Sequence, residues 1–421
     1  MKKNKANSQF VKDVNKSLLL EVIDRRYNVS RAEIARETGL SPTTVSALIE
    51  ELKQNELVKE LGQKPIQRGR RPVVYQINYE SHFIVAADLG SNILTILITD
   101  LKLNVIHESQ IPIGDQTGQD LVRVLYQSIK NVILTSGIEP SKIIGVGVAS
   151  PGLVDNVTGT VVKSVNLQWE TIPLKGILEH ELGFPVFVEN MNHAAAVGEY
   201  KRGLNQEARR FLYLNIGRGV GASVILNGEV MRGSGVSAGE LGHFIMDRYG
   251  EKCTCGARGC LETLVSMRAI LEKTRRLAKQ FPDSLLNTMV NGDLDKITLE
   301  TLIQAARQND LQATNLLVEI AEWIGLAVAG MINIFNPDVI MLGGRVMKSA
   351  GDMLIKIVQN VARENSLPVL FRMTKFVLPQ LGHLSSAIGA ADFVYQEEFK
   401  KKTLHNVSDF SNIPTNITGN L

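Results

Sequence analysis

The chain has 421 residues, of which 44% are apolar and 21% charged, with a formal net charge of +3. These proportions are those of an ordinary globular protein and, at roughly 100–200 residues per domain, predict two to four domains. Residues 1–79 carry fifteen basic and nine acidic side chains (net +6), whereas the remainder carries 31 and 34 (net −3). A basic segment on a mildly acidic body indicates either a nucleic-acid-binding module or a solvated basic face.

No secretion leader and no membrane span are expected. Lys2 and Lys3 resemble the basic start of a leader, but Glu21 interrupts the apolar run that follows, and no small-residue cleavage site comes after it. The longest apolar stretch, around residues 323–332, is shorter than the ~20 residues that a membrane-spanning helix requires. We therefore expect a cytoplasmic protein without membrane association.

The first eighty residues predict a helix-turn-helix. A first helix is indicated by apolar residues at helical spacing before residue 27. Ser30 and Glu33 form a capping-box pattern that starts a second, short helix, and Gly39 suits the turn that ends it. Ser41 then caps a third helix, which has a proline at its first position. This order of a helix, a short glycine-containing turn and a helix is typical of a DNA-binding motif.

The residues that follow predict a wing. Strand-like stretches at 57–61 and 73–77 flank a basic segment, which would contact phosphates or the minor groove, while the N-terminal residues of the recognition helix contact base edges. The expected DNA contacts are Ser41, Thr43, Thr44 and Ser46 in the helix and Arg68, Arg70 and Arg71 in the wing. The alternative is a helical hairpin with a charged loop. We predict a winged helix-turn-helix domain over residues 1–80 that binds operator DNA.

The rest of the chain predicts an α/β fold. Short apolar strands end in glycine or polar turns and alternate with helical segments, and ligands bind at such strand ends. The predicted strands are 82–87, 143–148, 185–188, 211–216 and 339–342.

The turns after these strands carry an ordered set of motifs. They are residues 149–153, the pair Glu189-Asn190, residues 238–243, and a cluster of the three cysteines. In this order they resemble the ROK family of sugar repressors and kinases. The resemblance covers nearly the whole chain and implies a two-lobed, actin-like (ribonuclease H-like) ATPase fold for a sugar-sensing domain over residues 81–395. A polar tail over residues 396–421 is expected to be disordered.

A metal site is predicted from the cysteines. Cys253, Cys255, Cys260 and His243 form the pattern G-H-x9-C-x-C-G-x-x-G-C, which matches the zinc motif of the family. One imidazole and three thiolates suit tetrahedral Zn²⁺, and four protein ligands leave no open position, so the zinc would be structural and would fix the loop that carries Glu262. The alternative is three thiols beside a histidine without a metal.

The resemblance also implies a sugar pocket. Its lining would be Asn190, Glu240, His243 and Glu262, which supply the amide, carboxylates and imidazole that pair with sugar hydroxyls. The alternative is that these are ordinary polar groups of the core or surface.

Three departures from the kinases of the family indicate that the chain has no catalytic residue. Met191 occupies the position of the aspartate that acts as base, and a thioether does not accept a proton at neutral pH. At the first phosphate turn, Ser91-Asn92 replaces Gly-Thr, and at the second, Arg218 lies between two glycines. We therefore expect a sensor and keep an ATP-dependent sugar kinase with an appended DNA-binding domain as the alternative. A repressor that senses no sugar is the third reading.

Met191 also bears on the effector. An apolar side chain at that position suits a pentose, which lacks the sixth carbon and its hydroxyl, so xylose is the first candidate; Arg218 makes a sugar phosphate the competing one. The sequence thus predicts a sugar-responsive repressor that binds two half-sites as a homodimer or homotetramer.

Overall fold

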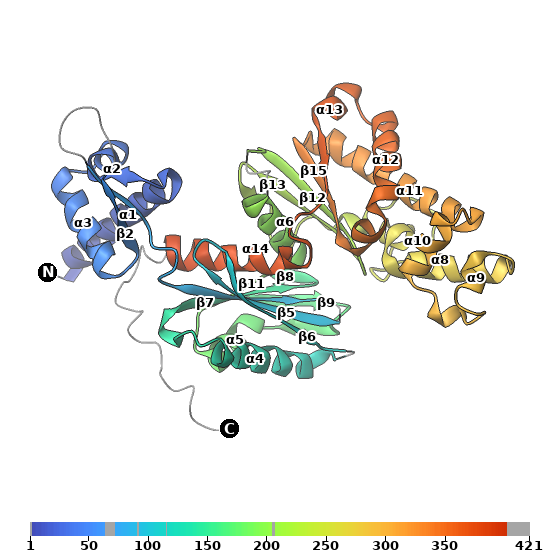
Figure 1. Cartoon of the computed structure of the whole chain (residues 1–421), viewed down its shortest axis with the longest axis horizontal. Coiled ribbons are helices and arrows are strands. Elements are labelled where there is room, and N and C mark those ends of the chain that lie inside the picture. The colour runs from blue at the N-terminus through green and yellow to red at the C-terminus, as the bar shows by residue number, and fades with distance from the viewer. Residues whose placement is uncertain (1, 64–71, 91, 115, 204–206, 402–421) are drawn as a thin grey trace. The chain divides into compact units, whose positions relative to one another are not determined.

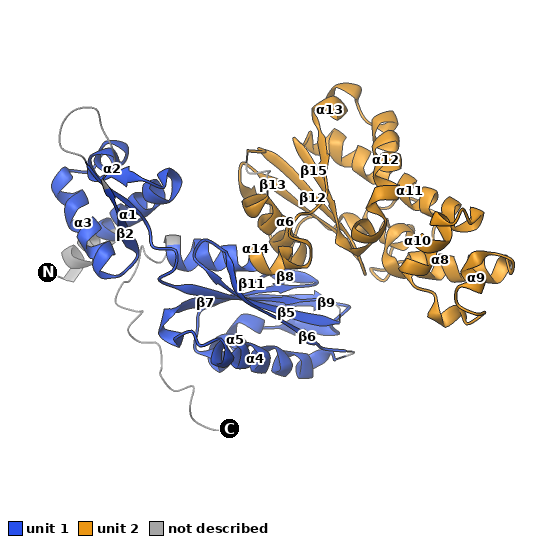
Figure 2. Ribbon diagram, viewed as in Figure 1, with its two compact units in different colours: residues 1–189, 390–421 blue, residues 190–389 orange. Residues whose placement is uncertain are grey.

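The computed structural model describes residues 2–63, 72–90, 92–114, 116–203 and 207–401 (Figure 1). The chain divides into two compact units (Figure 2). Unit 1 comprises residues 1–189 and 390–421, and unit 2 comprises residues 190–389. The predicted sensing domain, residues 81–395, is therefore divided between the two units.

Unit 1 begins with a winged helix, in which the three-stranded sheet has the order β1-β3-β2. Ser30 and Glu33 form the predicted capping box, Gly39 ends the second helix with a φ of 71°, and Ser41 caps the third. The first helix begins at residue 2, well before its apolar stripe. The elements are α1 (Lys2–Arg26), β1 (Val29–Ser30), α2 (Arg31–Thr38), α3 (Pro42–Gln54), β2 (Val58–Gln63) and β3 (Val73–Ile77).

A five-stranded mixed sheet, with the order β11-β7-β4-β5-β6, forms the centre of unit 1. The apolar faces of α4 and α5 pack against it, and Trp169 fills the same core while its indole N–H donates to the Gly118 carbonyl at 2.7 Å. The elements are β4 (Phe83–Leu89), β5 (Ile93–Asp100), β6 (Val105–Pro112), α4 (Gly118–Thr135), β7 (Ile143–Ser150), β8 (Leu153–Asp155), β9 (Thr160–Ser164), β10 (Trp169–Ile172), α5 (Leu174–Leu182) and β11 (Val186–Asn190).

Unit 2 is built on a second five-stranded sheet, of order β14-β13-β12-β15-β16, so the predicted α/β class is confirmed. All five strands predicted from the sequence are present, within two residues at each end. The elements of unit 2 are α6 (Met191–Arg202), β12 (Arg210–Ile216), β13 (Val220–Leu226), β14 (Glu229–Val230), α7 (Glu262–Val265), α8 (Met267–Gln280), α9 (Leu285–Thr288), α10 (Leu299–Arg307), α11 (Leu311–Phe335), α12 (Gly344–Asn365), α13 (Pro368–Met373) and β16 (Lys375–Val377), with β15 (Val339–Gly343).

Helix α11 is long and apolar enough, by length and composition alone, to cross a membrane. The longest apolar stretch of the sequence, around residues 323–332, lies within it. Twelve of its residues are buried, and it packs along α12 and α10 within the core of unit 2. Such burial is that of a core helix in a folded domain.

The last described residues pack against the winged helix, so the expectation of a disordered tail is wrong for residues 396–401. Helix α14 (Ser385–Val394) continues into η5 (Tyr395–Lys401), a π-helical segment that contacts α1. Phe399 is buried there and stacks on Tyr395, with ring centroids 5.2 Å apart. The two aromatic rings provide apolar burial in this stretch, although its overall composition is polar. Residues 402–421 lie outside the described residues.

Asp24 links α1 to the rest of unit 1. Its carboxylate accepts a hydrogen bond from the Tyr79 hydroxyl at 2.8 Å. Burial, followed by the negative charge of Asp24, raises the pKa of Tyr79, and the same two causes raise the pKa of Tyr395. The ammonium of Lys102, in the hairpin between β5 and β6, lies over the rings of Tyr27 and Tyr79. The winged helix is thus joined to the first sheet by specific polar contacts and not by chain connectivity alone.

Candidate functional site

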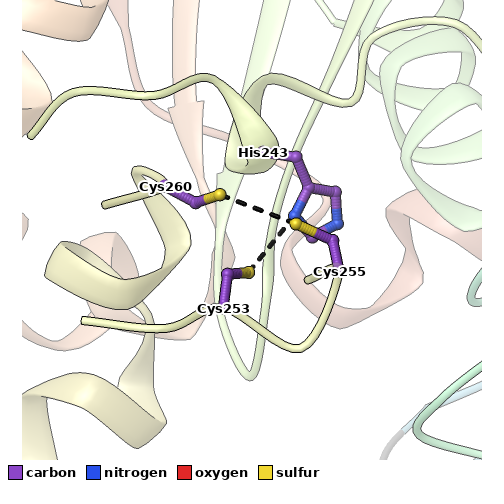
Figure 3. A group of neighbouring side chains, drawn as sticks. All are labelled: His243, Cys253, Cys255 and Cys260. Carbon is purple, nitrogen blue, oxygen red and sulfur yellow. Dashed lines mark hydrogen bonds between the residues drawn. The ribbon is translucent and has the colours of Figure 1, made fainter. Parts of the chain in front are cut away.

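The three cysteines and His243 converge in unit 2 (Figure 3). Their four possible ligand atoms all lie within 4.8 Å of one another. Cys255 Sγ is 3.7 Å from Cys260 Sγ, and Cys253 Sγ is 3.5 Å from His243 Nδ1. Sulfur atoms bound tetrahedrally at about 2.3 Å from one Zn²⁺ would be about 3.8 Å apart. The cluster is therefore of the right size and composition to hold a metal ion.

The loop that carries the cysteines is held tightly by its backbone. The Cys253 N–H donates to the Ala257 carbonyl at 2.8 Å, and the Gly256 N–H donates back to the Cys253 carbonyl at 3.0 Å. Gly259 has a φ of 69°, and a Cβ added there would lie 1.4 Å from the Asp247 carbonyl oxygen. Only glycine fits that position, because the backbone at residue 259 lies directly against the backbone at Asp247. The shape of the cysteine loop therefore depends on this close backbone contact as well as on the cysteines.

Protonation differs among the thiols. The Ala257 backbone N–H lowers the pKa of the exposed Cys255, whereas burial raises the pKa of Cys260 to about 12. A bound divalent cation would supply the positive charge that the buried Cys260 thiolate needs.

The predicted pocket residues lie near one another at the start of β13. The Glu262 carboxylate, at the first position of α7, accepts the Val220 N–H at 3.0 Å. Burial raises the pKa of Glu240, the Coulombic interactions with His243 and His193 oppose this rise, and the interaction with Glu262 adds to it. A Cβ at Gly242, between Glu240 and His243, would lie 2.1 Å from the Val220 carbonyl oxygen. Because Glu262 accepts the N–H of the same Val220, the backbone brings Glu240, His243 and Glu262 to one region.

Asn190 joins this group through α6. It is buried at the N-cap, and its Oδ1 accepts the backbone N–H groups of Asn192 at 2.8 Å and His193 at 3.3 Å. The Asn192 side chain then lies so close to Gly221 that a Cβ there would be 2.1 Å from Asn192 Nδ2. The start of α6 therefore packs directly against the strand that Glu262 holds, and unit 2 brings all four predicted pocket residues to one region.

His193 belongs to the same region and carries no sequence motif that would identify it. Its imidazole is buried, with Nε2 2.9 Å from the Ala238 carbonyl oxygen. The sequence separation between these two residues hides the contact.

The structure also places the three residues that the sequence singled out as departures from the kinases of the family. Met191 is half-buried at the first position of α6. Asn215, near the end of β12, donates from its Nδ2 to Asn192 Oδ1 at 2.8 Å. Arg218 is exposed in the turn between β12 and β13.

Asp88, at the end of β4 in unit 1, has a buried oxygen, Oδ1, without a hydrogen-bond partner among the described residues. Burial raises the pKa of its carboxyl from 3.8 to about 7. Because the folded-state pKa is the higher one, ionisation of Asp88 opposes folding. The contribution of this one group to stability is therefore greatest below about pH 4 and falls as the pH rises towards 7.

We expect Asp88→Asn to remove this fall, which amounts to roughly 1.4 kcal/mol per unit of pKa difference, and to raise the melting temperature at pH 8. The measurement is thermal unfolding between pH 4 and pH 8. Asp155→Asn is the matched control. Hydrogen bonds from Thr158 lower the pKa of Asp155, so replacing this carboxylate should leave the fall in stability between pH 4 and pH 7 unchanged. An unchanged pH dependence in Asp88→Asn would contradict the assignment.

In the winged helix, α3 presents a polar N-terminus. Ser41 Oγ accepts the Thr44 N–H at 3.1 Å and lies 2.8 Å from Thr44 Oγ1, so these two hydroxyls cap the helix. Thr43 is exposed and Ser46 half-buried, and Ala47, which the sequence analysis did not single out, is exposed one turn beyond Thr43. Arg68, Arg70 and Arg71 lie outside the described residues.

Residues 84–397 match the sequence profile described as ROK family. The chain belongs to the ROK family. Residues 13–59 separately match a winged helix-turn-helix DNA-binding profile. The two units of this ROK protein accordingly contain an N-terminal winged helix followed by the two sheets of the actin-like fold, as the sequence predicted.

Relatives of this ROK protein include repressors and kinases. It is 30% identical over 393 residues to the xylose repressor of Caldicellulosiruptor bescii, which covers 93% of this chain and 98% of the relative. A crystal structure of a ROK family transcriptional regulator, a homolog of the E. coli MLC protein, superposes with a TM-score of 0.82 at 27% identity over 94% of this chain and all of that one. The ROK glucokinase from Streptomyces griseus, solved with glucose and AMPPNP, has a TM-score of 0.67 at 27% identity and covers 75% of this chain and 99% of its own.

Proposed function

We propose that this ROK protein is a sugar-responsive transcriptional repressor. The winged helix, residues 1–80, binds operator DNA through Thr43 and Ser46 of α3, with Ser41 and Thr44 at the helix cap and Arg68, Arg70 and Arg71 in the wing. The sensing domain, residues 81–395, binds a sugar. The observation that carries this proposal is the convergence of Glu240, His243 and Glu262 beside Asn190 in a chain that also contains a winged helix.

The sugar is bound without being phosphorylated. Met191 at the start of α6 offers no proton acceptor to a sugar hydroxyl, so general-base catalysis from this position is absent. The alternative is a sugar kinase with an appended DNA-binding domain, which the similarity to a ROK glucokinase favours. Release of ADP from ATP in the presence of sugar distinguishes the two functions.

The metal is a structural Zn²⁺ held by His243, Cys253, Cys255 and Cys260. The ligand set and the 3.5 Å and 3.7 Å separations support zinc, and four protein ligands exclude a bound reactant. With Nδ1 on the metal side, the other ring nitrogen of His243 remains for the sugar. One histidine thus joins the metal centre to the pocket.

The effector is a pentose, with xylose as the first candidate. Met191 replaces a carboxylate that would contact the outer hydroxyls of a hexose, and the relative from Caldicellulosiruptor bescii is named a xylose repressor. A sugar phosphate held by Arg218 is the competing effector. The active species is a cytoplasmic homodimer or homotetramer, because repressors with this module read two half-sites.

Calorimetric titration with xylose, glucose, N-acetylglucosamine and their phosphates tests the proposal. Wild-type protein is expected to bind one of them, and Glu240→Gln to bind it about 10- to 150-fold more weakly, because hydrogen bonds to charged groups contribute about 1.5–3 kcal/mol. Glu229→Gln, an exposed carboxylate on β14, is the control. Binding of DNA selected from random duplexes should change roughly 5- to 150-fold with sugar. Absence of binding to every sugar would leave a DNA-binding protein that does not sense them.

A further inference from the structure

The first turn of α6 contacts two separate parts of the pocket. Asn190 caps the helix, and its own side chain is one of the proposed sugar contacts. His193, three residues on, has its backbone N–H on Asn190 Oδ1 and its imidazole Nε2 2.9 Å from the Ala238 carbonyl oxygen. His193 is only 1% exposed, so it does not reach solvent.

The loop after Ala238 is pressed against β13 on its other side. The Ala222 N–H donates to the Gly239 carbonyl at 2.9 Å. Gly239 has a φ of 89°, and a Cβ there would lie 2.2 Å from the Ala222 carbonyl oxygen. The same closeness recurs at Gly242, where a Cβ would be 2.1 Å from the Val220 carbonyl oxygen. The backbone over residues 238–242 therefore has little freedom between α6 and β13.

Glu240 depends on this backbone for its position. Within the described residues its carboxylate has no hydrogen bond, in contrast to Glu262, which the Val220 N–H holds at 3.0 Å. The position of the Glu240 carboxylate therefore depends on the backbone of the loop. Glu240 lies two residues after Ala238, whose carbonyl His193 contacts. A shift of this backbone would move the carboxylate out of hydrogen-bond distance of a sugar hydroxyl, and the affinity of the protein for the sugar would fall.

We propose that His193 is a positioning residue that fixes the distance between Asn190 and Glu240 by donating from Nε2 to the Ala238 carbonyl. This inference rests on the proposed sugar-binding function. A single helical turn then holds an amide directly and a carboxylate through the loop, so two hydroxyls of the effector are read at a fixed spacing. His193 consequently governs discrimination between sugars that differ in the configuration of one hydroxyl.

Three substitutions test the role of the imidazole. His193→Leu removes the donor and leaves the Ala238 carbonyl without this partner, and His193→Asn carries an amide too short to reach the carbonyl. His193→Gln places a side-chain N–H near the position of Nε2 and is the conservative rescue. We expect His193→Leu and His193→Asn to weaken effector binding about 10- to 100-fold, the usual effect of removing a partner that orients a ligand group. We expect His193→Gln to recover most of that loss.

Two further readouts separate positioning from a merely structural role. The affinity ratio between the effector and its single-hydroxyl epimers should fall in His193→Leu and return in His193→Gln, with metal content and DNA affinity unchanged. In the sugar-free protein, hydrogen exchange at the Ala222 and Leu241 amides should accelerate in His193→Leu. An epimer ratio equal to that of the wild type, or unchanged exchange, would overturn the inference. If the wild type binds no sugar, the proposed function is wrong and the affinity ratio between epimers cannot be measured. The hydrogen-exchange rates would still show whether His193 anchors the loop.

Discussion

Cys260→Ser is expected to lose the metal and effector binding together. Cys260 is fully buried, pairs with Ile245 as an isolated bridge, and precedes by two residues the proposed sugar ligand Glu262. Structural zinc contributes about 10–16 kcal/mol to the folding of isolated zinc-finger peptides. Even a fraction of that in unit 2 predicts a fall in melting temperature on the order of 10 °C. Metal content by mass spectrometry, thermal unfolding and calorimetry provide the three measurements.

His243→Cys is the matched variant, because it separates the metal from the pocket. A fourth thiolate keeps a tetrahedral zinc site, so metal content and melting temperature should stay close to those of the wild type. The imidazole nitrogen proposed to face the sugar is lost, so effector affinity should still fall. Full metal content in Cys260→Ser would show that the other three ligands suffice. If His243→Cys binds the effector as tightly as the wild type does, His243 is not one of the residues that contact the sugar.

The second large effect is expected at Gly389, in α14. A Cβ there would lie 1.7 Å from the Ala194 carbonyl oxygen of α6, and backbone atoms of two packed helices have no room to give. We expect Gly389→Ala to destabilise unit 2 by more than about 3 kcal/mol, the upper range for overpacking, with a fall in melting temperature of about 10 °C. Because α6 holds Asn190 and His193, effector affinity should decline with it.

Gly330→Ala is the control, because it is the same substitution at another helical glycine of the same unit. Gly330 lies inside α11, and an added Cβ would meet nothing within 4 Å. Alanine in a helix interior is more stable than glycine by about 0.5–1 kcal/mol, so Gly330→Ala should unfold at a slightly higher temperature than the wild type. Similar melting temperatures for the two variants would mean that α14 and α6 can separate without loss of stability.

Local signals explain why much of the winged helix could be predicted. Ser30, Gly39 and Ser41 act on their own helix ends, so their type and spacing suffice to place those ends. The convergence of the three cysteines with His243 could also be predicted from the sequence, because three of the four residues lie within one short loop and few chemistries use that combination.

Contacts between distant segments account for what sequence reasoning missed. The contact of His193 with Ala238 depends on how α6 packs against the loop before η2 (Leu241–His243), and nothing in either segment alone indicates it. The helix over residues 395–401 was missed for the same reason, since its polar composition predicts a tail, whereas the buried rings of Tyr395 and Phe399 pack in the folded unit. The start of α1 at residue 2 was missed because its first turns lack an apolar stripe.

The contact of η5 with α1 also has a consequence for synthesis. A ribosome completes α1 long before it reaches Tyr395, and domains generally fold from the N-terminus as they emerge. The winged helix therefore appears first, with the surface that η5 later covers still exposed to solvent. For that interval a nascent chain carries a DNA-reading module that no effector-binding domain yet controls.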